Sequence, residues 1–258
     1  MYVLTRAKML MLIFLVTSSW ALALFTYLYH RGWIDQQRFA HIGGVDSSVQ
    51  VTEIQSGVFK LPAPVTVGTM SVEEAIFLRR SKREYLDKPL ELSKFAQLLW
   101  SSQGMTEPRW GLRTAPSAGG TYPLEIYAVV GENCVKGLAS GIYRYNPKDH
   151  TIIVVVSGDF REKLSAAALN QQWIAKASVS IVIAAVYERT TRTYGSRGTR
   201  YADMEAGHVG QNLYLIATAM SLGAVVVGAF HDEEVQSVLG IPRDQIPLYI
   251  VPVGYPKE

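Results

Sequence analysis

Residues 113–130 read RTAPSAGGTYPLEIYAVV. The stretch contains five small or rigid residues that let a backbone approach another molecule closely, namely Pro116, Ser117, Ala118, Gly119 and Gly120. An apolar run from Leu124 to Val130 follows them and predicts a strand. The Ser-x-Gly core is also similar to half of a nucleophile elbow. The stretch therefore predicts either a backbone cradle for a flat ligand or a catalytic serine at Ser117.

Helices and strands are expected on both sides of this stretch. Capping boxes open two helices, from Ser71 to about Arg80 and from Asp159 to Leu169. Further helices are expected over about 93–102, 201–222 and 232–239, and strands over 124–130, 141–145, 151–156, 179–187, 224–227 and 248–253. Since the order shows no regular βαβ alternation, we predict an α+β domain with a mainly antiparallel sheet.

The composition is that of a globular protein and does not favour a nucleic-acid-binding protein or a metalloprotein. The chain has 258 residues, 48% of them hydrophobic and 18% charged, which is ample for a packed core. A net charge of +3, with one dense basic run at 79–83, does not predict nucleic-acid binding. The single Cys134 and five histidines without ligand spacing do not predict a metal site.

The first thirty residues contain an apolar segment. Met9 to Tyr29 is a run of 21 residues without charge, and a helix of that length at about 1.5 Å per residue crosses a hydrocarbon layer of about 30 Å. Residues 1–31 therefore predict a signal anchor, with Arg6 and Lys8 on the cytoplasmic side. Two alternatives are a secretory signal peptide cleaved near Ala21-Leu22-Ala23 and an apolar helix buried in the domain. The first two interpretations place the domain outside the cytoplasm, either membrane-anchored or, after cleavage, secreted or periplasmic.

Residues 32–70 show no sustained hydrophobic period and are interrupted by glycine, serine and proline. We predict a tether there, with a few extended pieces, and a folded domain over 71–258.

The basic run Arg79-Arg80-Ser81-Lys82-Arg83 places guanidiniums and a hydroxyl close together at the end of the first predicted helix. Such groups hold a phosphate through charge-assisted, bidentate hydrogen bonds, although a solvated basic face has the same composition. Neither the dinucleotide fingerprint nor the P-loop motif occurs in the chain. A phosphate bound here would therefore belong to a mononucleotide cofactor.

The long predicted helix has core positions and one polar stripe. Met204, Leu213, Leu215, Ile216 and Met220 are expected in the core. Glu205, His208 and Asn212 share a stripe, and a Glu-His pair there is interpreted as structural.

The sequence resembles the FMN-dependent nitroreductase-like oxidoreductases, in particular the SagB-type (azoline) dehydrogenases, over about 61–256. The resemblance rests on five motifs in the family's order: LRRSKREY (78–85), APSAGGTYPLEIY (115–127), NQQWIAKAS (170–178), YGSRGTRYADMEAGHVGQNLYL (194–215) and VVVGAFHDEEVQSVLGIP (225–242). It implies a nitroreductase-like fold, a homodimer, an FMN cofactor and exchange of a hydride or an electron pair through flavin N5.

The resemblance also implies roles for individual residues. The FMN phosphate, ribityl chain and pyrimidine edge are expected on Arg79, Arg80, Ser81 and Arg83, and the polar rim of the flavin on Asn170 or Gln171. The residues 116–120 are expected to come from the partner subunit and to pack on the same flavin, while Val227 and Gly228 lie along the ring near N5.

One motif departs from the family's pattern. The azoline dehydrogenases carry a Lys-Tyr pair before a glycine, whereas this chain has Thr193-Tyr194-Gly195. Thr193 supplies no amine base, and Tyr194 is left as the candidate proton donor. The resemblance leaves open a small-molecule or peptide substrate, and NAD(P)H or a membrane redox partner as electron donor. Alternatives are a non-catalytic flavin-binding protein and a serine hydrolase using Ser117, Asp203 and His231.

Overall fold

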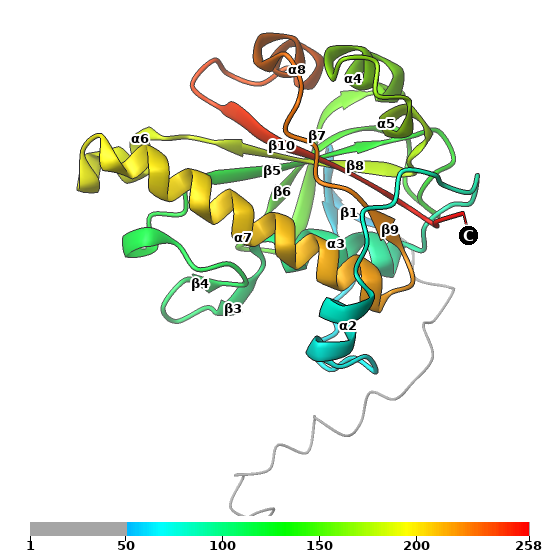
Figure 1. Ribbon diagram of the computed structural model, residues 1–258, viewed down its shortest axis with the longest axis horizontal. Helices are drawn as coiled ribbons and strands as arrows, with labels where there is room; N and C mark the ends of the chain where they lie inside the picture. The colour runs from blue at the N-terminus through cyan, green and yellow to red at the C-terminus, as the bar shows by residue number, and fades with distance from the viewer. Residues whose placement is uncertain (1–50, 258) are drawn as a thin grey trace, which may run out of the picture. The chain divides into compact units, whose positions relative to one another are not determined.

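The computed structural model of the chain describes residues 51–257 (Figure 1). The predicted anchor or signal segment, 1–31, lies outside the described residues, and so does the tether as far as residue 50. No helix within 51–257 combines the length and the apolar character needed to cross a bilayer.

One eight-stranded sheet forms the centre of the domain (Figure 1). Its strands follow the order β1-β2-β7-β6-β5-β8-β10-β9, and every ladder between neighbours is antiparallel. The strands are β1 (Thr52–Gln55), β2 (Val58–Lys60), β5 (Leu124–Val130), β6 (Gly141–Asn146), β7 (Thr151–Ser157), β8 (Val179–Ala185), β9 (Gly223–Ala224) and β10 (Ile246–Gly254). A separate hairpin joins β3 (Met105–Glu107) and β4 (Leu112–Arg113). The predicted α+β class with a mainly antiparallel sheet is confirmed.

Helices cover both faces of this sheet (Figure 1). They are α2 (Val72–Leu78), α3 (Leu92–Gln103), α4 (Arg161–Ala167), α5 (Gln172–Lys176), α6 (Glu188–Tyr194), α7 (Arg197–Ala219) and α8 (Asp232–Leu239), with a 3-10 turn η2 (Ala118–Gly120). Residues of α3 and α7 pack in one hydrophobic cluster, and residues of α4, α5 and α8 in the other. The sheet is therefore the middle layer of three.

The alternation of side chains along β8 explains why its sequence is apolar throughout. All seven of its residues are buried. Val179, Ile181 and Ile183 join the cluster under α3 and α7, while Val182 and Ala184 join the opposite cluster. A strand covered on both faces needs apolar residues at every position, so its sequence lacks the alternation of apolar and polar residues that marks a half-exposed strand.

Several predicted boundaries hold and others move. Ser71 caps α2 by accepting a hydrogen bond from the Glu74 amide at 3.1 Å, and α8 ends at Gly240, which has a positive φ of 64°. The capping box predicted at Asp159 is wrong in detail, because Phe160 precedes the first turn of α4 and Asp159 accepts from the Arg161 amide instead.

The predicted boundary between tether and domain at residue 71 is too late. Residues 52–60 form β1 and β2, and β2 pairs with β7 in the main sheet. Both strands are short, and all four residues of β1 are exposed, so neither shows the alternating pattern that predicts a strand.

Candidate functional site

The basic run lies directly after α2 and is held against β9, the strand at one edge of the sheet. Ser81 forms an isolated parallel bridge with Ala224 of β9, and the Lys82 amide donates to the Ala224 carbonyl at 3.0 Å. Gly223 allows this approach, since a Cβ there would stand 2.8 Å from the Lys82 Cβ. The run therefore lies beside the segment that leads from α7 into β9.

Tyr214 of α7 links this run to the segment after β9. Its hydroxyl is 2.9 Å from Ser81 Oγ and accepts a hydrogen bond from the Val226 amide at 2.9 Å. The Arg79 guanidinium carbon lies 5.0 Å from the centre of the Tyr214 ring, within cation–π range. One tyrosine thus brings together two of the predicted phosphate-binding residues and the neighbour of Val227.

A third segment, the start of α5, reaches the same region. The guanidinium carbon of Arg83 lies 5.6 Å from the Trp173 ring, and Gln171 Nε2 donates to the Ala229 carbonyl at 2.7 Å. Gly228 is exposed and faces the Tyr249 ring, which a Cβ on Gly228 would meet at 3.6 Å. The predicted residues at 79–83, 170–171 and 227–228 therefore converge, although their contact with a cofactor stays a prediction.

The arginines of this region carry charge without a carboxylate partner. Within residues 51–257, no ion pair involves Arg79, Arg80 or Arg83. Arg80 Nη1 donates to the carbonyls of Phe77 and Arg79, at 2.9 and 2.7 Å, which leaves the other guanidinium N–H groups for a further acceptor. The region can bind an anionic group by charge-assisted hydrogen bonds.

The segment 116–120 lies elsewhere in the chain, against the end of α6. Gly119 has φ 60°, and a Cβ on it would stand only 2.6 Å from the Tyr194 hydroxyl oxygen. Tyr194 is 38% exposed, and its ring meets the Tyr201 ring edge-on at a centroid distance of 5.2 Å. The structure thus brings Tyr194, the candidate proton donor, to the small residues 116–120. Among the described residues, no hydrogen bond connects Tyr194 or the 116–120 segment with the arginine region.

The serine-hydrolase alternative lacks its geometry. Ser117 Oγ accepts from the Tyr122 amide at 2.9 Å, and Asp203 Oδ1 accepts from the Tyr187 hydroxyl at 2.6 Å. His231 stands at the N-cap of α8, where its amide donates to the Ala167 carbonyl. Among residues 51–257, these three side chains make no hydrogen bond to one another.

The polar stripe of α7 divides between core and solvent. Glu205 is buried and accepts from Gln103 Nε2 at 2.9 Å, whereas His208 is exposed. Burial raises the pKa of the Glu205 carboxyl, against the hydrogen bonds from Ser117 and Gln103. The predicted Glu-His pair is therefore wrong, and so is the core position of Met204, which is 48% exposed.

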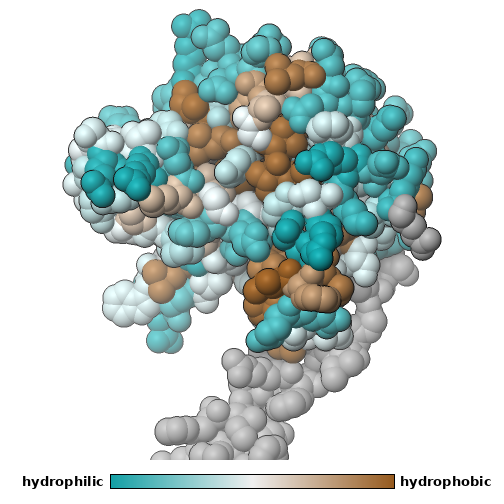
Figure 2. Space-filling view, in the orientation of Figure 1, coloured by the Kyte–Doolittle hydropathy of each residue, from teal (hydrophilic) through white to brown (hydrophobic). Residues whose placement is uncertain are grey.

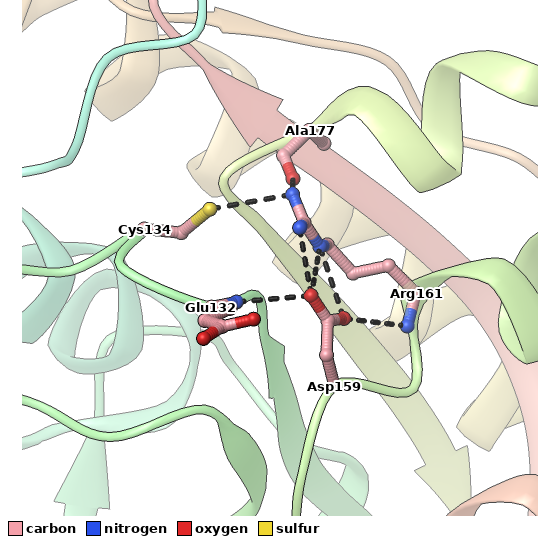
Figure 3. A network of polar contacts seen from close by, with 5 residues as sticks. All are labelled: Glu132, Cys134, Asp159, Arg161 and Ala177. Atoms are coloured by element: carbon pink, nitrogen blue, oxygen red, sulfur yellow. Dashed lines mark hydrogen bonds and ion pairs between the residues drawn. The ribbon is translucent and has the colours of Figure 1, made fainter.

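A second polar network is structural. Arg161 forms an ion pair with Asp159 and donates to Cys134 Sγ at 3.3 Å and to the Ala177 carbonyl at 3.1 Å (Figure 3). Asp159 also accepts from the Glu132 amide at 2.9 Å (Figure 3). Burial raises the pKa of the Cys134 thiol, which keeps it protonated and unreactive.

Sequence reasoning gave no role to Tyr214 or Trp173. The sequence places Tyr214 on the long helix, but it does not predict the contact with Ser81, because the two residues are 133 positions apart in the chain. Trp173 belongs to the NQQWIAKAS motif, and that motif was the only signal of its place. No group of three or more potential metal-ligating side chains occurs in the described part of the chain.

Comparison with known proteins identifies relatives of this chain. A family model described as the nitroreductase family matches residues 76–255. The protein named "Putative nitroreductase MJ1384" of Methanocaldococcus jannaschii is 46% identical over 185 residues, which cover 72% of this chain and 91% of that protein. The crystal structure of a "putative nitroreductase" from Ralstonia eutropha JMP134 has a TM-score of 0.68 and 25% identity, covering 84% of this chain and 97% of that one.

More distant similarity extends to a peptide-processing system. The microcin B17-processing protein McbC of Escherichia coli is 24% identical over 165 residues, which cover 63% of this chain and 61% of McbC. A chain of the E. coli microcin synthetase McbBCD complex, solved with truncated pro-MccB17 bound, has the same fold, with a TM-score of 0.61 and 19% identity over 90% of this chain and 87% of that one.

Proposed function

Since the chain belongs to the nitroreductase family, we propose that it is an FMN-dependent oxidoreductase. The observation that carries the cofactor assignment is the convergence of Arg79, Ser81 and Arg83 with Tyr214 and Trp173 in one region. That convergence is independent of the family match, because it follows from contacts between segments far apart in the sequence.

The donor set of this region fits the phosphate of a mononucleotide. Three arginines without ion pairs in the described chain and one hydroxyl supply N–H and O–H donors, with no carboxylate among them. In the proposed site, Arg79, Arg80, Ser81 and Arg83 hold the phosphate, ribityl chain and pyrimidine edge of FMN. Asn170 or Gln171 contacts the polar rim, and Val227 and Gly228 lie along the ring.

The chemistry divides between cofactor and chain. When bound, FMN exchanges a hydride or an electron pair with the substrate through N5. The chain holds and orients the cofactor, and the exposed Gly228 lets the backbone lie close to a flat ring. Tyr194, partly exposed at the end of α6, is the proposed proton donor.

We propose that the site is completed in a homodimer. The segment 116–120 packs beside Tyr194, and the hydrogen bonds of residues 51–257 do not join it to the arginine region. A second copy of the chain would bring its own 116–120 segment to the flavin. Equilibrium sedimentation of the full chain tests this, since a stable monomer that still binds FMN would contradict the shared site.

The substrate class is a small molecule or a peptide. Similarity to McbC, which is named for processing microcin B17, favours a peptide. Thr193 offers no amine, so abstraction of a substrate proton by a lysine is not available at this position. A non-catalytic flavin-binding protein is the second candidate, and turnover with artificial donors and acceptors separates the two.

We also propose that the domain lies outside the cytoplasm, because residues 9–29 form an apolar segment without charge. The donor would then be a membrane quinol or a redox partner, since NADH and NADPH are cytoplasmic pools. A reporter fused after Glu258 should give an extracytoplasmic signal, and nicotinamides should reduce the flavin slowly. Rapid NADPH turnover together with a cytoplasmic reporter signal would contradict both.

Release of the cofactor from the purified full chain tests the assignment directly. The protein should be yellow, and mass analysis should identify FMN. Arg79→Ala should weaken FMN retention by about 1.5–3 kcal/mol, the range for a hydrogen bond to a charged group. The matched control is Lys82→Ala, since Lys82 is exposed and its backbone rather than its ammonium makes the contact with Ala224. Equal losses in the two variants, or a colourless chain that ignores added FMN, would contradict the proposal.

A further inference from the structure

A small pocket lies among the end of α3, the β4 strand, the start of β5 and the first turn of α6. It has a volume of about 50 Å³ and is partly enclosed by Gln103, Arg113, Glu125, Tyr145 and Arg189, among others. One water needs about 10–15 Å³, so the pocket has room for about three to five waters. A ligand of three or four non-hydrogen atoms fills such a volume.

The charge of this pocket is not balanced. Arg189 pairs with Glu125 through Nη2 and donates to the Tyr122 carbonyl through Nη1 at 3.2 Å. Arg113 has no ion pair among residues 51–257, and its Nε is buried without an acceptor there. Two guanidiniums therefore line the pocket with one carboxylate.

The guanidinium of Arg113 makes its direct contacts with neutral groups, while the Glu205 and Glu125 carboxylates attract it from beyond ion-pair distance. Its guanidinium carbon lies 4.3 Å from the centre of the Tyr122 ring, and its Nη1 donates to Gln103 Oε1 at 3.4 Å. The other end of the Gln103 amide donates to Glu205, so Gln103 stands between the arginine and that carboxyl. Burial lowers the pKa of Arg113, as expected of a cation that has left water without an equivalent partner.

We propose that this pocket binds a small oxyanion of the class of formate, nitrate and bicarbonate, held between Arg113 and Arg189. Planar oxyanions match the planar, forked donors of guanidinium, and an anion here compensates a partly desolvated charge. An anion of three or four non-hydrogen atoms fits this volume whole, whereas a bulkier one does not. This inference does not depend on the proposed cofactor.

The bound anion would order the loop that carries the small residues. The Arg113 amide donates to the Tyr122 hydroxyl at 3.2 Å, and the Tyr122 amide donates to Ser117 Oγ at 2.9 Å. These hydrogen bonds connect the two ends of the loop, Arg113 and Tyr122, with Ser117 in its middle. An anion on Arg113 stabilises these connections.

Calorimetric titration of the full chain with sodium formate and sodium nitrate tests the site. Total ionic strength is kept constant with sodium gluconate, whose anion is too large for the pocket. We expect saturable binding with a Kd on the order of 1 mM for both small anions and no heat from gluconate beyond dilution. Absence of saturation up to about 50 mM would overturn the proposal.

Three variants locate the binding. Arg113→Gln should raise the Kd at least about 10-fold, and Arg113→Lys, which keeps the charge without the fork, should raise it less. The control is Arg192→Gln, because Arg192 forms an exposed ion pair with Glu188 on the same helix as Arg189. Formate affinity unchanged in Arg113→Gln, or reduced equally in Arg192→Gln, would overturn the assignment.

Discussion

Gly119→Ala should separate backbone strain from a specific contact with Tyr194. Gly119 has φ 60°, a value that residues with a side chain adopt at a cost of about 1–2 kcal/mol. The new Cβ would stand 2.6 Å from the Tyr194 hydroxyl oxygen and 3.3 Å from two ring carbons, so the tyrosine has to move. Because Tyr194 is 38% exposed, its side chain can move without breaking the core.

The displacement of Tyr194 has a cost of its own. Its ring meets the Tyr201 ring at 5.2 Å and 85°, an edge-on pair of a kind worth about 0.5–1.5 kcal/mol. Together with the strain, Gly119→Ala should destabilise the protein by about 1.5–3.5 kcal/mol. For a domain of this size each kcal/mol lowers the Tm by about 2–4 °C.

Gly111→Ala is the matched control. Gly111 has φ 67°, and a Cβ on it meets no atom within 4 Å, so this variant has the strain without the collision. Thermal unfolding of both variants, followed by circular dichroism, should show a Tm lower by about 1–6 °C in Gly119→Ala than in Gly111→Ala. Adding Tyr194→Phe removes the oxygen nearest to the new Cβ and should recover part of the difference. Equal Tm values for the two alanine variants, or no recovery, would refute the reasoning.

Three further predictions concern the stability of the fold. The Glu205→Gln variant should gain stability relative to the wild type as pH rises from about 4 to about 8, measured as the difference in Tm between the two proteins. A carboxyl with a raised pKa stabilises the fold below the unfolded pKa of 4.5, and this contribution is lost as pH rises through the folded pKa. A Tm difference that stays constant with pH would contradict this. Gly131→Ala should lower the free energy of unfolding by about 1–3 kcal/mol in denaturant titrations, because its Cβ would stand 2.2 Å from the Arg161 guanidinium. In an Arg161→Ala background, which removes the guanidinium, the same substitution should cause little further loss of stability. A chain that starts at Leu61 should have a lower Tm or aggregate compared with one that starts at Val51, since it loses β1 and β2 and exposes the edge of β7; equal behaviour of the two would show that these strands contribute nothing.

Elements with a strong local signal could be predicted from the sequence. The strand 124–130 and the helix 232–239 have the predicted bounds in the structure. The first is an apolar run bounded by turn residues, and the second is an amphipathic stretch that a glycine ends. Both signals act within a few residues of the chain, so the rest of the fold is not needed to interpret them.

Elements that depend on tertiary contacts were missed. The α6 sequence ERTTRTY has no apolar period, and only Thr190 is buried, where its hydroxyl lies 2.9 Å from that of Thr121. Met204 is apolar at a position of α7 that faces away from the core. Neither the existence of α6 nor the exposure of Met204 follows from local hydrophobicity, because both depend on which surfaces other segments cover.

The candidate site shows the same division. The arginines at 79–83 could be recognised because they are adjacent in the sequence and chemically distinctive. Their contacts with Tyr214 and Trp173 could not, because these depend on how α2, α5 and α7 meet around the edge of the sheet. Figure 2 shows apolar surface next to polar surface on the face that α7 crosses, an arrangement that only the folded chain reveals.

The place of β10 in the sheet has a consequence for synthesis. It is the last strand along the described residues, yet it lies between β8 and β9 rather than at an edge. Until the ribosome releases residues 246–254, the growing chain holds the β8 segment VSIVIAA with one edge unpaired, and this segment is uncharged and rich in β-branched residues. The sheet can therefore close only once residues 246–254 have left the ribosome, and products truncated before β10 should be insoluble and dependent on chaperones.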